Sequence, residues 1–136
     1  MQWAIVTIPM HAVVATSSVP LFVGALLSDW AYSGSQQIQW VNFAAWLIAG
    51  GLLIAGPALL WGAVAVLRSS ATRDRGGIAY LALLFATVVV GFINALVHAK
   101  DGWAAMPTGL ILSAVVVLLA AAASAFGLAG LTRRPA

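Results

Sequence analysis

The chain has no cysteine, no glutamate and very few charged residues of any kind. Without cysteine there is no disulfide framework, no thiolate metal site and no cysteine nucleophile. The sequence also lacks a glycine-rich phosphate loop, paired glutamates and an HExxH metal motif. The sequence therefore gives no sign of a cysteine-dependent enzyme, a phosphate-loop nucleotidase, a glutamate-pair hydrolase or an HExxH metalloprotease.

Charge is scarce because the composition is that of a membrane protein. Of 136 residues, 63% are hydrophobic and 7% are charged, and the mean hydropathy is strongly positive. Such a chain has too little polar surface to cover a soluble globule. The basic residues behind the net charge of +3 lie at the ends of apolar runs, so nucleic acid is not an expected partner.

Four apolar runs are each long enough for the roughly 20 residues that span a bilayer core. They lie at about 5–27, 38–67, 78–97 and 110–131. The first lacks the basic start of a secretory signal and is too long for one, so it is expected to remain as a helix. Short connections make consecutive helices antiparallel neighbours. The predicted fold is all-α, a single antiparallel bundle of four transmembrane helices over residues 1–136.

The basic residues predict an orientation. Five of the six lie in the connection at 68–77 and in the tail, namely Arg68, Arg73, Arg75, Arg133 and Arg134. Lys100 alone belongs to the other side, and a turn-forming stretch at 30–37 connects the first two runs there. Basic residues stay preferentially in the cytoplasm, so both termini are predicted on the cytoplasmic side of a bacterial inner membrane.

Each run has residues at helical spacing that predict the face turned into the bundle. The predicted faces are His11, Ser18, Phe22, Ala25 and Asp29; Asn42, Trp46, Ala49, Leu53 and Gly56; Thr87, Gly91, Asn94, His98 and Asp101; and Ser113, Val117, Ala120, Ser124 and Gly127. Pro57, with glycines before it, is expected to kink or tilt the long second helix.

The most informative stretch is 95–103, Ala-Leu-Val-His-Ala-Lys-Asp-Gly-Trp, where the third run ends. Antiparallel packing brings this end close to the ends of the first two helices. The predicted polar cluster is Asp29, Asn42, Asn94, His98, Lys100 and Asp101. In the favoured interpretation the cluster is structural, with an ion pair and amides that bridge helices. In the other, a histidine beside carboxylates relays protons or binds a divalent metal.

Several of these residues resemble a known family. The stretch 94–103, followed by Pro-Thr-Gly-Leu-Ile-Leu-Ser at 107–113, and the early His11, Pro20 and Asp29, are similar to the bacterial four-helix membrane proteins grouped as domain of unknown function 2231. The resemblance covers nearly the whole chain, although residues 10–12 read Met-His-Ala where a His-Pro start is expected. It implies a small helical bundle of the inner membrane, and no biochemical role.

His11 and His98 are the candidate cofactor-binding residues. A haem b between two histidines is the tempting interpretation, because membrane cytochromes use such ligands. His11 lies 18 residues before Asp29, about 27 Å along a helix, whereas His98 is expected near the level of Asp29. The histidines should therefore lie on opposite sides of the membrane. No cofactor is predicted, and a haem held by one histidine or shared with another subunit is the alternative.

The predicted function is that of a non-enzymatic subunit or assembly partner of a larger membrane complex. The loops are so short that another subunit, or a second copy of the chain, would bind mainly through the lipid-facing helices. One alternative is a membrane redox protein that holds haem b or contacts quinone through a histidine. Another is a small proton- or ion-conducting bundle, for which few intramembrane charges are present.

Overall fold

The computed structural model describes residues 9–129 of the chain, and this part is helical without a strand. The helices are α1 (Met10–Ser17), α2 (Val19–Ser35), α3 (Ile38–Arg68), α4 (Arg75–His98), α5 (Gly102–Ala105) and α6 (Thr108–Ala129). Helices α1 and α2 follow each other as one candidate span, Met10–Ser35, and α3, α4 and α6 are the other three. The predicted all-α fold with four apolar spans is confirmed.

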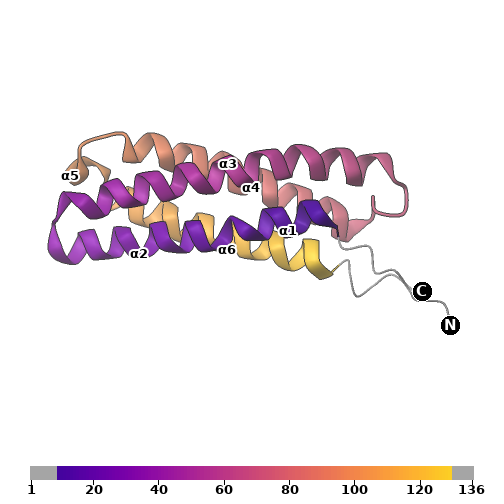
Figure 1. Cartoon of the computed structure of the whole chain (residues 1–136), viewed down its shortest axis with the longest axis horizontal. Helices are drawn as coiled ribbons and strands as arrows, with labels where there is room; N and C mark the ends of the chain where they lie inside the picture. The colour runs from indigo at the N-terminus through magenta and orange to yellow at the C-terminus, as the bar shows by residue number, and fades with distance from the viewer. Residues whose placement is uncertain (1–8, 130–136) are drawn as a thin grey trace.

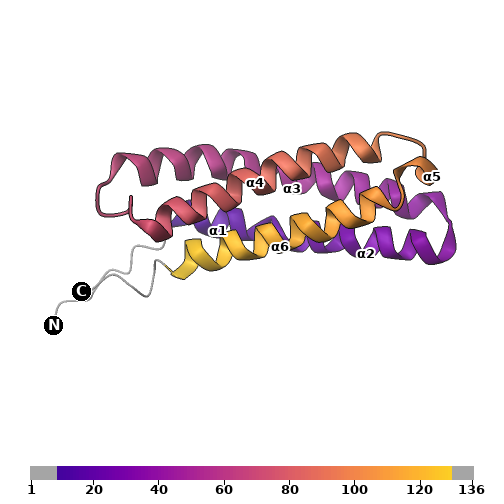
Figure 2. The same ribbon diagram turned by 180° about the vertical axis from the view of Figure 1, so that it is seen from behind.

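The spans form an up-and-down bundle, elongated along the helices (Figure 1). The α1–α2 span packs against α3 and α6, and α4 packs against the same two helices. The α1–α2 span and α4 therefore run in the same direction on opposite corners of the bundle. The start of α1, the 69–74 connection and the end of α6 lie at one end, and α5 with the α2–α3 turn lies at the other (Figures 1 and 2). We call these the 69–74 end and the α5 end.

The first span differs from the predicted helix at 5–27. It is interrupted at Ser18, because Pro20 has no backbone N–H and its ring cannot follow a regular turn, and it continues to Ser35. The turn predicted at 30–37 shrinks to Gln36 and Gln37, with Gln36 left-handed at φ 59°. The hydroxyl of Ser35 donates to the carbonyl of Ala31, one turn earlier in α2, at 2.7 Å. Residues 5–8 lie outside the described part.

The other spans agree more closely with the predicted ends. Helix α3 is continuous through Pro57. Helix α4 starts three residues before the predicted 78, because Asp74 Oδ1 accepts the backbone N–H of Gly77 at 2.8 Å and caps the helix. The short α5 was not predicted. Helix α6 is described to Ala129, and its predicted end at 131 lies outside the described residues.

The interior faces of α2, α4 and α6 follow the predicted pattern, and that of α3 does not. Trp46 and Leu53, predicted to face inward, are 79% and 76% exposed, and Asn42 is exposed as well. The buried line of α3 is Val41, Ala44, Ile48, Gly51, Ala55, Ala58, Gly62 and Val66. Its small residues let helices approach closely, as at Gly51, where an added Cβ would come within 2.5 Å of the Phe22 ring. In lipid, large apolar side chains gain little from burial, so close contact decides which face points inward.

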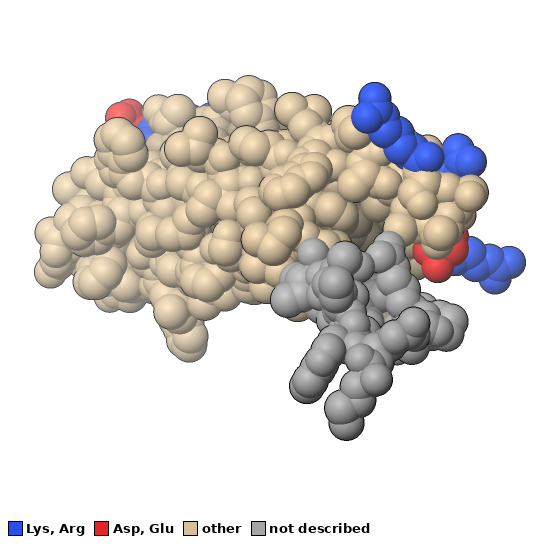
Figure 3. All heavy atoms as spheres, turned by 45° about the vertical axis from the view of Figure 1, so that its right-hand side comes forward, with Lys and Arg blue, Asp and Glu red and all other residues tan. Residues whose placement is uncertain are grey.

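Within residues 9–129, the exposed charged side chains lie near the two ends of the bundle. Figure 3 shows Lys and Arg gathered near the 69–74 end, with a tan surface between the ends. Large apolar side chains are exposed along the helices, among them Leu60 (71% exposed), Phe85 (60%) and Leu118 (70%). A lipid-facing surface of this kind is expected of a bundle whose four spans are long and apolar enough to cross a membrane.

Candidate functional site: a buried polar cluster at the α5 end

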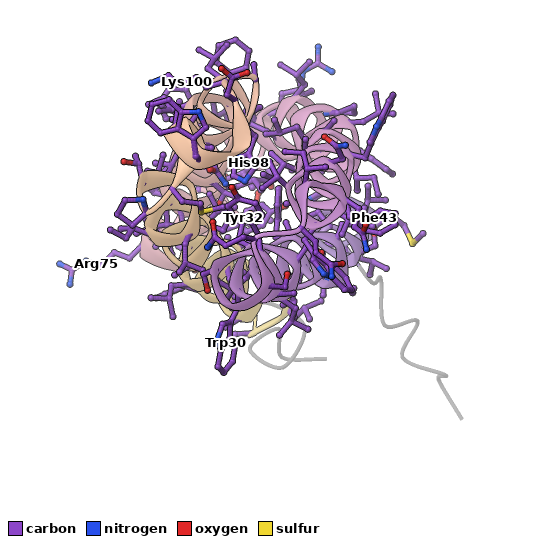
Figure 4. The ribbon with its side chains drawn as sticks, turned by 90° about the vertical axis from the view of Figure 1, so that its left-hand side faces the viewer. Trp30, Tyr32, Phe43, Arg75, His98 and Lys100 are labelled. Carbon is purple, nitrogen blue, oxygen red and sulfur yellow. The ribbon has the colours of Figure 1, made fainter. Side chains whose placement is uncertain are left out.

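Asp29 and His98 are joined across the middle of the bundle. His98 Nε2 lies 2.8 Å from Asp29 Oδ1, and neither side chain is exposed. Asp29 comes from the inner face of α2 and His98 from the last turn of α4. Figure 4, viewed from the α5 end, shows His98 pointing between the helices while Trp30 and Lys100 point outward. The bond thus connects two spans that occupy opposite corners.

Ser113 and Asn94 complete the cluster. The Ser113 hydroxyl donates to Asp29 Oδ2 at 2.5 Å and accepts from Asn94 Nδ2 at 2.9 Å. His98 Nδ1 is 2.9 Å from the backbone carbonyl of Asn94, one turn earlier in α4. All four residues are at least nine-tenths buried. Asp29, Asn94, His98 and Ser113 are called the buried polar cluster from here on.

The hydrogen bonds fix where the protons lie. A carbonyl oxygen only accepts, so His98 Nδ1 must carry a hydrogen. The 2.8 Å contact between His98 Nε2 and Asp29 Oδ1 then needs one further proton, because two lone pairs would repel each other. The cluster is either an imidazolium beside a carboxylate or a neutral imidazole beside a carboxylic acid. In both forms Asp29 and His98 together hold two protons.

One acceptor of the cluster has no partner. Within residues 9–129, Asn94 Oδ1 is the only buried side-chain nitrogen or oxygen without a hydrogen bond. Asn94 itself is 1% exposed. Buried amide oxygens are normally satisfied by protein or by ordered water. This oxygen is therefore an available acceptor, and Asn94 Nδ2 is already bonded to Ser113.

Glycine lets the backbone approach the buried polar cluster closely. An added Cβ on Gly109 would come within 2.8 Å of His98 Cε1, so the backbone of α6 lies directly on the imidazole ring. Gly102 in α5 approaches Tyr32 in a similar way, with an added Cβ 3.2 Å from the phenol oxygen. Sequence reasoning placed Ser113 on the inner face of α6 but not in the cluster, and it did not single out Gly109. The signal was available, because antiparallel packing puts the start of α6 level with the end of α4.

The structure brings together only part of the predicted six-residue cluster. Asp29, Asn94 and His98 meet, whereas Asn42, Lys100 and Asp101 are exposed. Asn42 is separated because α3 turns another face inward. Lys100 and Asp101 are separated because α4 ends at His98 and Asp101 has an extended ψ of 145°, so helical spacing no longer applies to them.

His11 lies at the 69–74 end, far from His98. Its Nδ1 is 3.2 Å from the hydroxyl of Tyr80, and its ring meets Trp61 edge-on at a centroid distance of 6.3 Å. Tyr80 precedes His98 by 18 residues on α4, about 27 Å along the helix. The two histidines are therefore at opposite ends of the bundle.

The two histidines differ in whether a ring nitrogen is free to bind a metal or a haem iron. Within the described range, no group of three or more His, Cys, Asp or Glu side chains is placed to hold a metal ion. Both ring nitrogens of His98 are already bonded, and an axial bond from Nε2 to iron would have to replace the bond to Asp29. His11 Nε2 has no hydrogen bond within residues 9–129. Of the two histidines, His11 has the freer nitrogen.

The fold and composition define the chain as a small helical membrane protein with four candidate spans. A family model described as "Predicted membrane protein (DUF2231)" matches residues 7–132. The chain belongs to this family, as the segments around His98 and Ser113 predicted. Neither the curated proteins nor the solved structures gave a match.

Proposed function

We propose that this protein is a non-enzymatic subunit or assembly partner of a larger complex in a bacterial inner membrane, with both termini in the cytoplasm. The observation that supports this function is the shortness of the connections, which span 36–37, 69–74 and 99–107. They give a soluble partner little to bind. The large surface of the protein is the lipid-facing one, and a stable partner would contact helices there.

The lipid-facing side of α3 is the best surface for such contact. Trp46, Leu53 and Leu60 lie along one side of this helix and are 71–79% exposed. Asn42 belongs to the same side, and its amide has no side-chain hydrogen bond within the described part. An outward-facing amide on a membrane helix bonds readily across a helix–helix interface. This side of α3 therefore offers a partner helix one hydrogen-bonding amide and a row of large apolar side chains.

A matched pair of substitutions tests this surface. Leu53 on α3 and Leu118 on α6 are 76% and 70% exposed, so Leu→Trp adds the same bulk to either lipid-facing side. In native gels of membranes solubilised in mild detergent, the wild-type protein is expected in a species much larger than one bundle. Leu53→Trp should shift it to the size of the bundle alone, and Leu118→Trp should not. A wild-type protein that always migrates as a single bundle would contradict the proposal.

A second candidate is a membrane redox protein, supported by the surroundings of His11. Its Nε2 is unbonded within the described residues, and a phenol and an indole lie beside the ring. Such a histidine suits one axial haem bond or a hydrogen bond to a quinone. An absorbance spectrum of protein expressed with ample haem tests the cytochrome directly. A Soret band that His11→Gln removes would support it, and a spectrum without the band would favour the structural subunit.

Proton conduction has less support. The interior polar groups at the two ends are separated by Leu84 and Phe22, each 1% exposed. Between them, the hydroxyls of Ser18 and Thr87 bond to carbonyls of their own helices. A continuous hydrogen-bonded path from end to end is therefore not formed by the described side chains.

A further inference from the structure

We propose that Asp29 and His98 form a proton-binding site that exchanges its proton with the aqueous side at the α5 end and not with the opposite side. The site is independent of the subunit role proposed above. Its ligand is the proton shared by His98 Nε2 and Asp29 Oδ1, which are 2.8 Å apart. The backbone of α6 at Gly109 lies against the His98 ring, and Asn94 Oδ1, one turn farther inside, is an unpartnered acceptor.

Release of this proton changes the contact from attraction to repulsion. With the proton present, Nε2 and Oδ1 share a charge-assisted or strong neutral hydrogen bond. Without it, a carboxylate oxygen faces an imidazole lone pair, because Nδ1–H is committed to the Asn94 carbonyl. The proton goes to water, leaving an Asp29 carboxylate and a neutral His98. The direct connection between α2 and α4 is then lost.

Access differs strongly between the two sides. His98 is the last residue of α4, and exposed residues follow it immediately, so the cluster is about one helical turn from the surface. Toward the 69–74 end, the interior continues for about five turns and is filled at Phe22 and Leu84. The unpartnered oxygen of Asn94 lies one turn farther inside than His98, where it can accept a hydrogen bond from a buried water molecule.

Few other ionisable groups face the pair. From α2 the nearest in sequence is Tyr32, one turn past Asp29, and from the α4–α5 connection Lys100 and Asp101 follow His98. The first turns of α3 and α6, which pack nearby, have no ionisable side chain. Within the described residues, Asp29, His98 and Tyr32 are therefore the buried ionisable side chains at the α5 end.

The test compares two changes of the same chemical kind. In Asp29→Asn, the amide nitrogen can donate to His98 Nε2 and the amide oxygen can accept from Ser113, so the bonds remain but the ionisable proton is gone. Asp101→Asn makes the same change at an exposed carboxylate. The thermal midpoint of each protein in lipid nanodiscs is measured from about pH 6 to pH 10, around and above the ordinary range of histidine.

The expected results follow from proton counting. Above about pH 6.5 an unfolded chain has an ionised aspartate and a neutral histidine, one proton fewer than the folded pair. The wild-type midpoint should therefore fall as pH rises, until the folded pair also releases its proton. Asp101→Asn should show the same fall, and Asp29→Asn should be nearly flat. If the thermal midpoint of Asp29→Asn fell with pH as much as that of the wild type, the proposal would be overturned. The same holds if replacing choline by sodium at constant ionic strength changed the midpoint of the wild type.

Two further measurements do not depend on the stability of Asp29→Asn. In His11→Gln, His98 is the remaining histidine, so the nitrogen-15 NMR signals of the imidazole belong to one ring. The Nε2 signal should change in one step with pH while Nδ1 stays protonated; two constant signals would overturn the site.

In liposomes with the purified protein, an internal pH dye should respond to an external acid pulse no faster than in protein-free liposomes. A faster response would overturn the one-sided access.

Discussion

A serine hydroxyl has one proton to donate, and Ser113 donates it to Asp29 while accepting from Asn94. Ser113→Ala should leave a buried carboxylate oxygen and a buried amide N–H without partners. The expected loss in the free energy of unfolding is about 2 kcal/mol or more. Ser124→Ala is the matched control, because the hydroxyl of Ser124 bonds only to the carbonyl of Ala120 in its own helix.

Reversible unfolding in mixed micelles measures both changes. Ser124→Ala should alter the free energy of unfolding by less than about 0.5 kcal/mol, since a helix carbonyl keeps its backbone partner. Equal losses for the two serines would show that the cluster does not contribute through its hydrogen bonds.

Gly109 supplies a second prediction, one of steric origin. Gly109→Ala would place a Cβ 2.8 Å from His98 Cε1, and the ring would have to leave its bond to Asp29. We expect a loss of about 1–3 kcal/mol, typical of overpacking. In a His98→Ala background the ring is absent, so the same change should cost much less.

Gly34→Ala is the control for Gly109→Ala, because an added Cβ at Gly34 meets nothing within 4 Å. In a helix this change should be neutral or stabilising by about 0.5–1 kcal/mol. Equal losses for Gly109→Ala with and without His98 would mean that the glycine is required for a reason other than the ring.

For single residues, the sequence predicted burial of polar side chains within regular helices but not beyond a helix end. Asp29, Asn94 and His98 lie on α2 and α4, where helical spacing gave the inward face correctly, whereas Asn42 on α3 is exposed. Lys100 and Asp101 follow the end of α4, where backbone conformation depends on the covering segment. The sequence does not reveal which hydroxyl reaches a carboxylate from another helix, so the role of Ser113 required the structure.

Helices in this bundle contact each other through small residues. On α6, Ala120 is 3% exposed while its neighbour Ala121 is exposed. Ala120→Leu should push α6 away from the interior and lower the thermal midpoint in detergent by several degrees, as about 1–3 kcal/mol of overpacking implies. Ala121→Leu should leave it unchanged because that side chain points to lipid. A similar midpoint for both variants would contradict the assigned face of α6.

Helix α3 shows why the buried face of a membrane helix is harder to predict than the number of helices. Length and hydropathy locate each span, because a bilayer needs about 20 apolar residues. They do not fix rotation about the axis when both sides are apolar. The seven-residue repeat of Ala44, Gly51 and Ala58 indicated the true inner face, whereas the polar Asn42 indicated the wrong one. In a membrane bundle the smaller side chains are the better guide.

For the whole molecule, the distribution of charge predicts the orientation. Arg68, Arg73 and Arg75 lie in or beside the 69–74 connection, at the end where Figure 3 shows blue side chains gathered, and Lys100 follows α4 at the α5 end (Figure 4). Because the chain has no cysteine, single cysteines can be labelled cleanly. An impermeant thiol reagent added to intact cells should label Ser33→Cys and not Ser70→Cys, and permeabilised cells should allow both. Labelling of Ser70→Cys alone from outside would reverse the proposed orientation.

The two cross-bundle bonds hold the α1–α2 span and α4 in one register. His11 meets Tyr80 and Asp29 meets His98, so in each span 18 residues separate the two contacts. This is about 27 Å, close to the hydrocarbon thickness of a bilayer near 30 Å. Sliding one span along the other would break a bond at each end. In a thinner bilayer, a bundle held in this register is expected to tilt as one body or to bend the lipid around it.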